Sequence, residues 1–165
     1  MRKFKELLTF LSGIFAAKRM PTNRELFYTM ALSVVGTDAS PNDLAPDELG
    51  CAESVDGIYF RLFKKHICDN FLSTYWMYKA LKEKPEFIRV LDKDVLPGDI
   101  VISPTQGANT GHVGIVGQNG IIMSNNSFKD SNGVKGIFDE NYTLASWRRY
   151  FFEKKGLGLH YFRVV

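Results

Sequence analysis

The sequence predicts an α+β fold in which helices come first and an antiparallel sheet follows. Apolar residues recur at helical spacing through the first half of the chain, and from Phe87 onward they gather in short runs typical of strands. The chain has 165 residues, of which 45% are hydrophobic, so it can form the core of one domain.

The elements of the first half are expected to be helices. Residues 7–17 follow a basic start and fit either a folded amphipathic helix or the apolar part of a secretory signal; we favour the helix, and the run is too short to cross a bilayer. Further helices are expected over 23–35, from 51 to about 67, and over 73–84 with Ser73 as a possible N-cap.

The second half is expected to supply the strands, because turn signals separate short apolar runs. A polar loop over 129–141 and a helix over 143–153 interrupt the series. The predicted strands cover 87–91, 99–103, 112–116, 121–126 and 159–164.

Cys51 stands where a turn is expected to become a helix. Gly50 precedes it, and an apolar helical pattern follows it. The unpaired N–H groups and the positive dipole end of a helix favour a thiolate, so this position predicts a lowered pKa and a reactive cysteine. A small buried cysteine is the alternative interpretation.

His112 is the candidate base for this thiol. It opens a predicted strand between Gly111 and Gly114, which would leave one face of the imidazole uncrowded. A histidine at a strand end can take the thiol proton and later protonate a leaving amine, provided that a third group holds the ring.

The length of the Asn-Gly hairpin decides which residue could be that third group. With a three-residue loop over 118–120, Asn126 lies opposite His112 and Ser124 shares its face. A two-residue loop would instead bring Asn125 to that face, because a slip of one residue exchanges the faces. Parity alone leaves both alternatives open.

Other chemistry has little support in the composition. The net charge of +3 would suit approach to nucleic acid or to an anionic bacterial wall, and does not choose between them. Cys51 and Cys68 are too few for a disulfide framework, and we interpret both as reduced thiols. The three histidines are far apart in the sequence, so we expect no metal and no cofactor.

Three motifs in order resemble the NlpC/P60 and CHAP superfamily of papain-like cysteine peptidases and amidases. They are Leu49-Gly50-Cys51-Ala52-Glu53-Ser54-Val55, then Leu96-Pro97-Gly98-Asp99-Ile100-Val101, then Gly111-His112-Val113-Gly114-Ile115-Val116 with its Asn-Gly hairpin. The resemblance covers 47–165 and implies a catalytic domain there, with 1–46 as a helical extension packed on it.

The resemblance also implies roles for individual residues. Cys51 would be the nucleophile, with its backbone N–H contributing to an oxyanion hole, and His112 would be the base. Many NlpC/P60 members carry a second histidine at the position that Ser124 occupies here. A serine is a poor orienting group by comparison. CHAP-type members use a Glu-x-Asn arrangement, which favours Asn126 over Asn125 as the third residue.

The function expected from this resemblance is a peptidoglycan hydrolase, an endopeptidase or N-acetylmuramoyl-L-alanine amidase acting at the bacterial cell wall. A phage lysis (endolysin) or virion-associated enzyme is plausible, with peptidoglycan rather than nucleic acid as partner, and an integral membrane protein is not expected. The alternatives are a catalytically weak or inactive binding or structural module and a protein-directed cysteine protease.

The remaining candidates are expected to be structural. Asp99 belongs to the turn and strand entry, and a Glu53 carboxylate would favour the helix dipole but oppose a thiolate. His66 and His160 are expected to be satisfied or exposed. Four aromatic residues could line a groove but are more often found in a core, namely Tyr75, Trp76, Tyr78 and Trp147.

Overall fold

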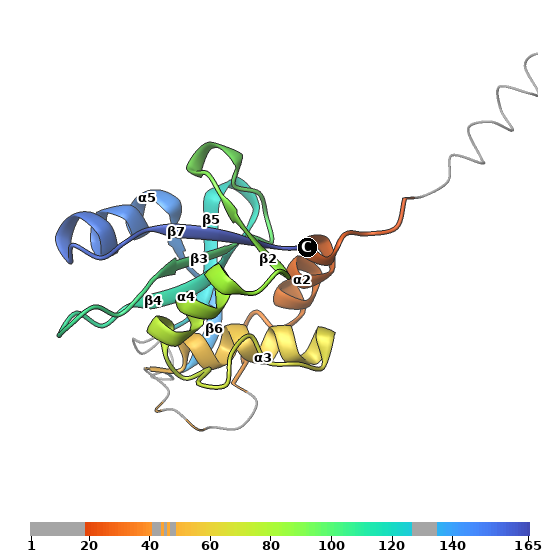
Figure 1. The fold of residues 1–165 in the computed structure, drawn as a ribbon, viewed down its shortest axis with the longest axis horizontal. Helices are drawn as coiled ribbons and strands as arrows, with labels where there is room; N and C mark the ends of the chain where they lie inside the picture. The colour runs from red at the N-terminus through yellow and green to blue at the C-terminus, as the bar shows by residue number, and fades with distance from the viewer. Residues whose placement is uncertain (1–18, 41–43, 45, 47–48, 127–134) are drawn as a thin grey trace, which may run out of the picture.

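The computed structural model describes residues 19–40, 44, 46, 49–126 and 135–165. The helix predicted over 7–17 lies outside these residues. In the described part, the order of elements confirms the α+β prediction, with helices before most of the strands (Figure 1). None of the helices found there is long and apolar enough to span a membrane.

The helices agree with the predicted ones to within a few residues. The last one begins as an α-helix and continues as a π-helix, so that the two segments together cover the predicted 143–153. The helical segments are α2 (Asn23–Ser33), α3 (Cys51–Phe63), α4 (Thr74–Glu83), α5 (Leu144–Trp147) and η4 (Arg148–Lys154), with short 3₁₀ turns η2 (Asp92–Asp94) and η3 (Gln118–Gly120).

The strands described form one antiparallel sheet in the order β1-β6-β5-β4-β3-β7-β2. Two of them were not predicted, β1 and β6. The strands are β1 (Thr37–Asp38), β2 (Phe87–Val90), β3 (Ile100–Ser103), β4 (His112–Val116), β5 (Ile121–Asn125), β6 (Ile137–Thr143) and β7 (His160–Val164).

The predicted polar loop over 129–141 is wrong at its C-terminal end, because 137–141 belong to β6. Asp139 and Glu140 are exposed while Phe138 is fully buried, so the strand contains too many polar residues to be recognised from its composition. The strand pairs with β5 on one side, and its first two residues, Ile137 and Phe138, pair with β1 on the other.

Helices cover both faces of the sheet, so there are two cores. Helices α2, α3 and α4 pack on the face that presents Ile102, Val113 and Ile115. Segments α5 and η4 pack on the opposite face, against Val116 and Ile122. Alternate residues of one strand therefore enter different cores.

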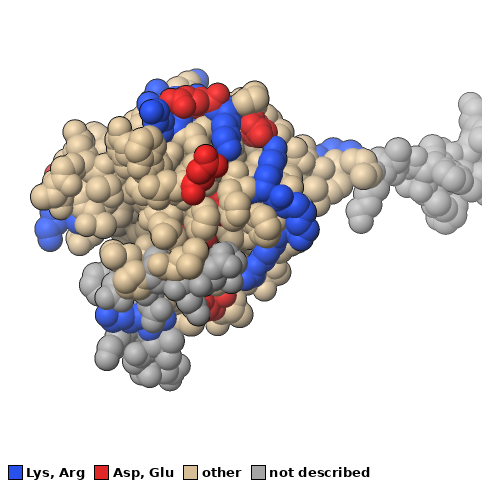
Figure 2. Space-filling view, turned by 60° about the horizontal axis from the view of Figure 1, so that its bottom comes forward, with Lys and Arg blue, Asp and Glu red and all other residues tan. Residues whose placement is uncertain are grey.

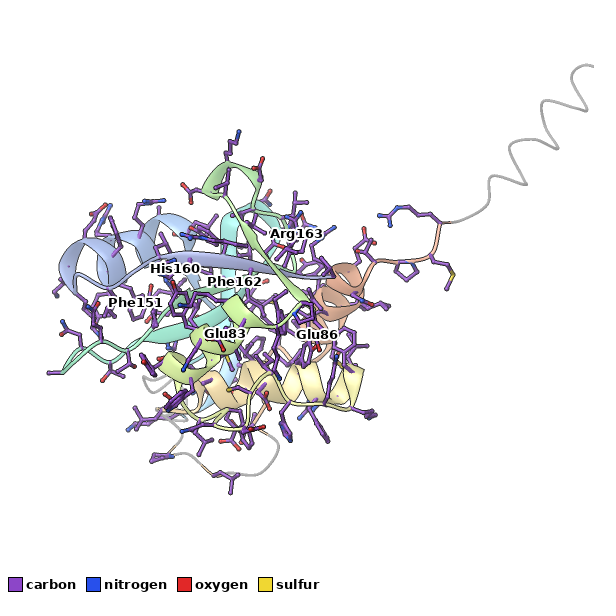
Figure 3. All side chains as sticks on the ribbon, viewed as in Figure 1. Glu83, Glu86, Phe151, His160, Phe162 and Arg163 are labelled. Carbon is purple, nitrogen blue, oxygen red and sulfur yellow. The ribbon has the colours of Figure 1, made fainter. Side chains whose placement is uncertain are left out.

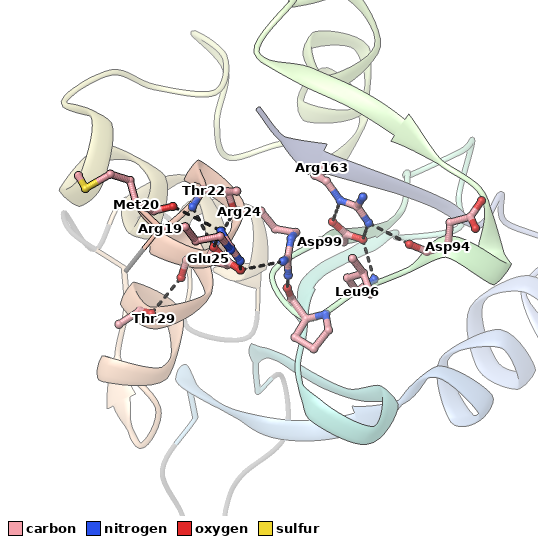
Figure 4. Close-up of polar contacts among 11 residues, drawn as sticks. Arg19, Met20, Thr22, Arg24, Glu25, Thr29, Asp94, Leu96, Asp99 and Arg163 are labelled. Atoms are coloured by element: carbon pink, nitrogen blue, oxygen red, sulfur yellow. Dashed lines mark hydrogen bonds and ion pairs between the residues drawn. The ribbon is translucent and has the colours of Figure 1, made fainter. Parts of the chain in front are cut away.

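Polar contacts join the first helix and the last strand to the turn before β3 (Figure 4). Arg24 of α2 donates to the carbonyl of Pro97. Arg163 of β7 donates two hydrogen bonds of 2.8 Å to the carboxylate of Asp99, which also accepts from the Leu96 N–H. Asp99 is fully buried, so this ion pair has a structural role, as predicted.

The surface charge is mixed. On the face in Figure 2, Lys and Arg side chains lie beside Asp and Glu side chains, so no single sign covers it. This mixture of signs agrees with the small net charge of +3, although some Lys and Arg side chains lie next to one another along one side of that face (Figure 2).

Candidate active site

Cys51 is the first residue of α3, as the sequence predicted. Gly50 occupies the N-cap position, and its carbonyl accepts from the Ser54 N–H at 2.8 Å. The thiol is almost completely buried, with 6% of the residue exposed. Backbone N–H groups of Val113 and Ala52 donate to its sulfur, so the start of α3 contacts β4 immediately beyond His112.

The predicted lowering of the Cys51 pKa is wrong in sign. Burial raises the pKa of this thiol to about 11, because a thiolate would lose its hydration. The hydrogen bonds from backbone N–H groups act in the opposite direction but are outweighed. The helix N-terminus is present, but the apolar surroundings of Cys51 dominate its effect.

His112 is the first residue of β4 and is 4% exposed. Its ring stacks on Phe151 of η4, with centroids 5.3 Å apart and planes 14° apart, and lies 5.2 Å from Trp147. The expectation of an uncrowded face is therefore wrong. Burial, followed by the positive charge of Lys155, lowers the pKa of His112 to about 3. Figure 3 labels Phe151 on this last helical segment.

The hairpin between β4 and β5 has the three-residue loop that places Asn126 and Ser124 on the face of His112. The Gly117 N–H donates to the Ile121 carbonyl at 2.7 Å, and Val116 pairs with Ile122. The same count gives Asn125 the opposite face, so the two-residue alternative is wrong.

The Ser124 side chain lies within hydrogen-bond distance of the His112 ring. Its Oγ lies 3.0 Å from Nε2 of His112, and Ser124 is fully buried. Asn126 lies where the register predicted, and its main chain pairs with Ile137 and Gly136. A role for the Asn126 side chain on this ring stays a prediction.

Asn141 is a residue of this site that the sequence did not indicate. The Ser124 hydroxyl donates to Oδ1 of Asn141 at 2.7 Å, and Nδ2 of Asn141 donates to the Ser124 carbonyl at 3.0 Å. The sequence placed Asn141 at the end of a polar loop. Tyr142, beside it, was a usable signal, since aromatic residues are enriched in strands.

Cys51 and His112 line one cavity of about 450 Å³. No direct hydrogen bond joins these two residues in the described part of the chain; what they share is this cavity and the contact of Cys51 with β4. The cavity takes its walls from the start of α3, the loops before α4 and β4, and the η4 region. The other lining residues are Leu49, Leu72, Ser73, Thr74, Thr105, Thr110, Gly111, Tyr142, Tyr150, Phe151 and Lys155.

The charge of the cavity is simple. Lys155 is the charged side chain among the described residues that line it, and its Nζ donates to the Thr110 carbonyl at 3.0 Å. The ammonium lies 5.3 Å from the centroid of Phe151, which stacks on His112. Burial raises the pKa of Cys51 and, followed by the Lys155 charge, lowers the pKa of His112, which favours a neutral thiol and a neutral imidazole as the resting pair.

The other candidates lie in structural contacts. Glu53 is buried and accepts from the Leu44 N–H at 3.3 Å, and His66 pairs with the buried Asp56 at 2.5 Å. His160 stacks on Tyr78 of α4, with centroids 4.5 Å apart. None of these side chains is among the lining of the cavity.

The candidate aromatic groove residues separate into two groups, and the partly buried Tyr78 packs against the core. Trp147 is fully buried and donates to the Ser103 hydroxyl at 3.0 Å, so it belongs to the core. Tyr75 and Trp76 are 51% and 44% exposed on α4, which leaves them available to a ligand outside the cavity.

Among the described residues, no group of three or more His, Cys, Asp or Glu side chains could hold a metal ion. Comparison with known proteins adds no relative: no protein-family model matches the chain, and no curated protein matches it.

Proposed function

We propose that the chain is a papain-like cysteine hydrolase of the NlpC/P60 and CHAP type that cleaves an amide bond of peptidoglycan. The observation that carries the proposal is a cysteine at the start of a helix sharing a cavity with a histidine at the start of a strand. The resemblance of the three sequence motifs supplies the substrate class. The site of action would be the bacterial cell wall, as for a phage lysis or virion-associated enzyme.

The neutral resting pair defines the order of events. His112 takes the thiol proton as the Cys51 sulfur attacks the amide carbonyl, so the charges form only as the bond forms. The tetrahedral oxyanion is stabilised by backbone N–H groups at the start of α3, including that of Cys51. The imidazolium then protonates the leaving amine, and water, deprotonated by His112, hydrolyses the acyl-enzyme.

Digestion of purified cell walls, with mass spectrometry of the released muropeptides, tests this mechanism and identifies the bond. Cys51→Ala should abolish release while the fold is retained, because Cys51 is the one thiol among the described residues that line the cavity. Cys68→Ala is the matched control, since Cys68 lies outside the cavity lining. Undiminished release by Cys51→Ala would contradict the mechanism.

A second candidate function is a binding or structural module of the same fold, without effective catalysis. The buried thiol with its raised pKa favours it, because a reactive cysteine is normally a thiolate near neutral pH. Cosedimentation with purified walls separates the two. A module binds walls and releases no muropeptide, with Cys51 present or replaced. A protein-directed protease would instead cleave a denatured protein and leave walls intact.

A further inference from the structure

Three side chains at the site form a continuous chain of hydrogen bonds. Nε2 of His112 lies 3.0 Å from Oγ of Ser124, and that hydroxyl lies 2.7 Å from Oδ1 of Asn141. Asn141 also donates from Nδ2 to the Ser124 carbonyl at 3.0 Å. This series of hydrogen bonds connects three neighbouring strands, β4, β5 and β6.

The amide of Asn141 has one orientation that satisfies both of its contacts. Its nitrogen must face the Ser124 carbonyl, because two carbonyl oxygens cannot share a hydrogen bond. Its oxygen therefore faces the Ser124 hydroxyl. An amide oxygen only accepts, so the single hydroxyl proton of Ser124 is used in this contact.

The direction of the remaining bond follows from this proton. With its proton directed to Asn141, the Ser124 oxygen can only accept from the His112 ring, so Nε2 of a neutral imidazole must carry the ring proton. Nδ1 then holds the lone pair. The nitrogen that can accept a thiol proton is thus set by Asn141, which does not touch the imidazole.

A β-bulge places Asn141 in this position. Ile122 pairs with Tyr142, but Met123 pairs with Glu140, so Asn141 is the extra residue of β6 at this point. A bulge redirects a side chain out of the regular alternation, and here it allows the amide to contact both the hydroxyl and the carbonyl of Ser124.

Gly114 provides the space for Ser124 on the other side. A Cβ at position 114 would lie 3.0 Å from Cβ of Ser124 and 2.7 Å from the Met123 carbonyl oxygen. Any larger residue would displace β5 from β4 and lengthen the contact between Ser124 and His112. The glycine therefore serves the approach of Ser124 rather than an open face of the imidazole.

We propose that Asn141 is a positioning residue that acts through Ser124 to hold His112 as the Nε2–H tautomer, with Nδ1 as the basic nitrogen. This proposal deepens the proposed hydrolase and rests on it for its catalytic meaning. The relay is neutral throughout, so it fixes the tautomer and the ring orientation without adding a carboxylate to stabilise an imidazolium.

The direct test is the tautomer of His112, measured by ¹⁵N NMR of the imidazole nitrogens at neutral pH. The native protein should show Nε2–H. Asn141→Ala and Ser124→Ala should each produce a mixture of tautomers, because either change frees the hydroxyl proton or removes the acceptor. Asn141→Asp should keep Nε2–H, since a carboxylate also accepts from Ser124.

Glu140→Ala is the matched control, because Glu140 is the exposed neighbour of Asn141 on the same strand. It should leave the tautomer unchanged. Asn141 is only partly buried, so Asn141→Ala is expected to fold, which thermal unfolding would check. An unchanged Nε2–H signal in folded Asn141→Ala and Ser124→Ala would overturn the proposal, as would a tautomer that depends on Asn126 instead.

Activity gives a second readout that fails separately. If the protein releases muropeptides, Asn141→Ala should lower kcat up to about a hundredfold with little change in KM, and Asn141→Asp should restore much of it. If the protein releases none, the proposed function fails while the tautomer measurement still decides the role of Asn141.

Discussion

The pH profile of Cys51 alkylation gives the sharpest measurement of the site. With Cys68→Ser removing the second thiol, whose pKa burial also raises to about 11, iodoacetamide should report Cys51 alone. A pKa of about 11 is two units above the ordinary 9.0. At pH 8 the thiolate fraction is therefore about one in a thousand, roughly a hundredfold below that of an ordinary thiol.

The predicted profile rises about tenfold per pH unit from 7 to 10 and has no plateau in that range. The slope is the measure, because the burial of Cys51 also slows the reagent at every pH. In denaturant the midpoint should return to about 9, which is the internal control. A plateau between pH 6 and 8 would refute the reasoning, since it would show a thiolate–imidazolium pair and a dominant effect of the helix N-terminus.

Two further predictions concern stability. Folding lowers the pKa of His112 from 6.5 to about 3. The free energy of unfolding should therefore be largest above pH 6.5 and fall by up to about 5 kcal/mol as the pH falls to 3. Denaturant unfolding at several pH values should show this slope, and His112→Gln should flatten it. Arg163→Met removes the ion-pair partner of the buried Asp99 carboxylate and should lower the free energy of unfolding by about 3–5 kcal/mol. In a double-mutant cycle, adding Asp99→Asn should recover part of this loss, and additive losses would contradict the pairing.

Local signals were sufficient for the skeleton of the site. Gly50 and the helical pattern after it located the start of α3. Asn119 and Gly120 have φ values of 54° and 72°, which is the left-handed conformation that an Asn-Gly turn favours, so the place of the turn could be anticipated, but its length could not. Register then follows by counting, and it places Ser124 on the face of His112.

Properties that depend on packing between distant segments could not be predicted in this way. The shift of the Cys51 pKa is opposite to the predicted one because β4 and its neighbours bury the thiol. No residue near Cys51 in the sequence indicates that burial. Asn141 was missed because a bulge belongs to the register between two strands rather than to either strand. Trp147 and Phe151 were expected in a helix. Their ring contacts with His112 could not be predicted, because they depend on where this helix packs on the sheet.

The pairing of β1 with β6 makes the N-terminal part of the chain a component of the sheet. Thr37 and Asp38 pair with the first two residues of the strand that carries Asn141, and Phe27 and Ala31 enter the same core as Val113. A chain shortened to begin at residue 47 would leave Ile137 and Phe138 of β6 unpaired on the side away from β5, open to a strand of another molecule. The short strand β1 thus covers part of this edge, and its removal should favour association through β6.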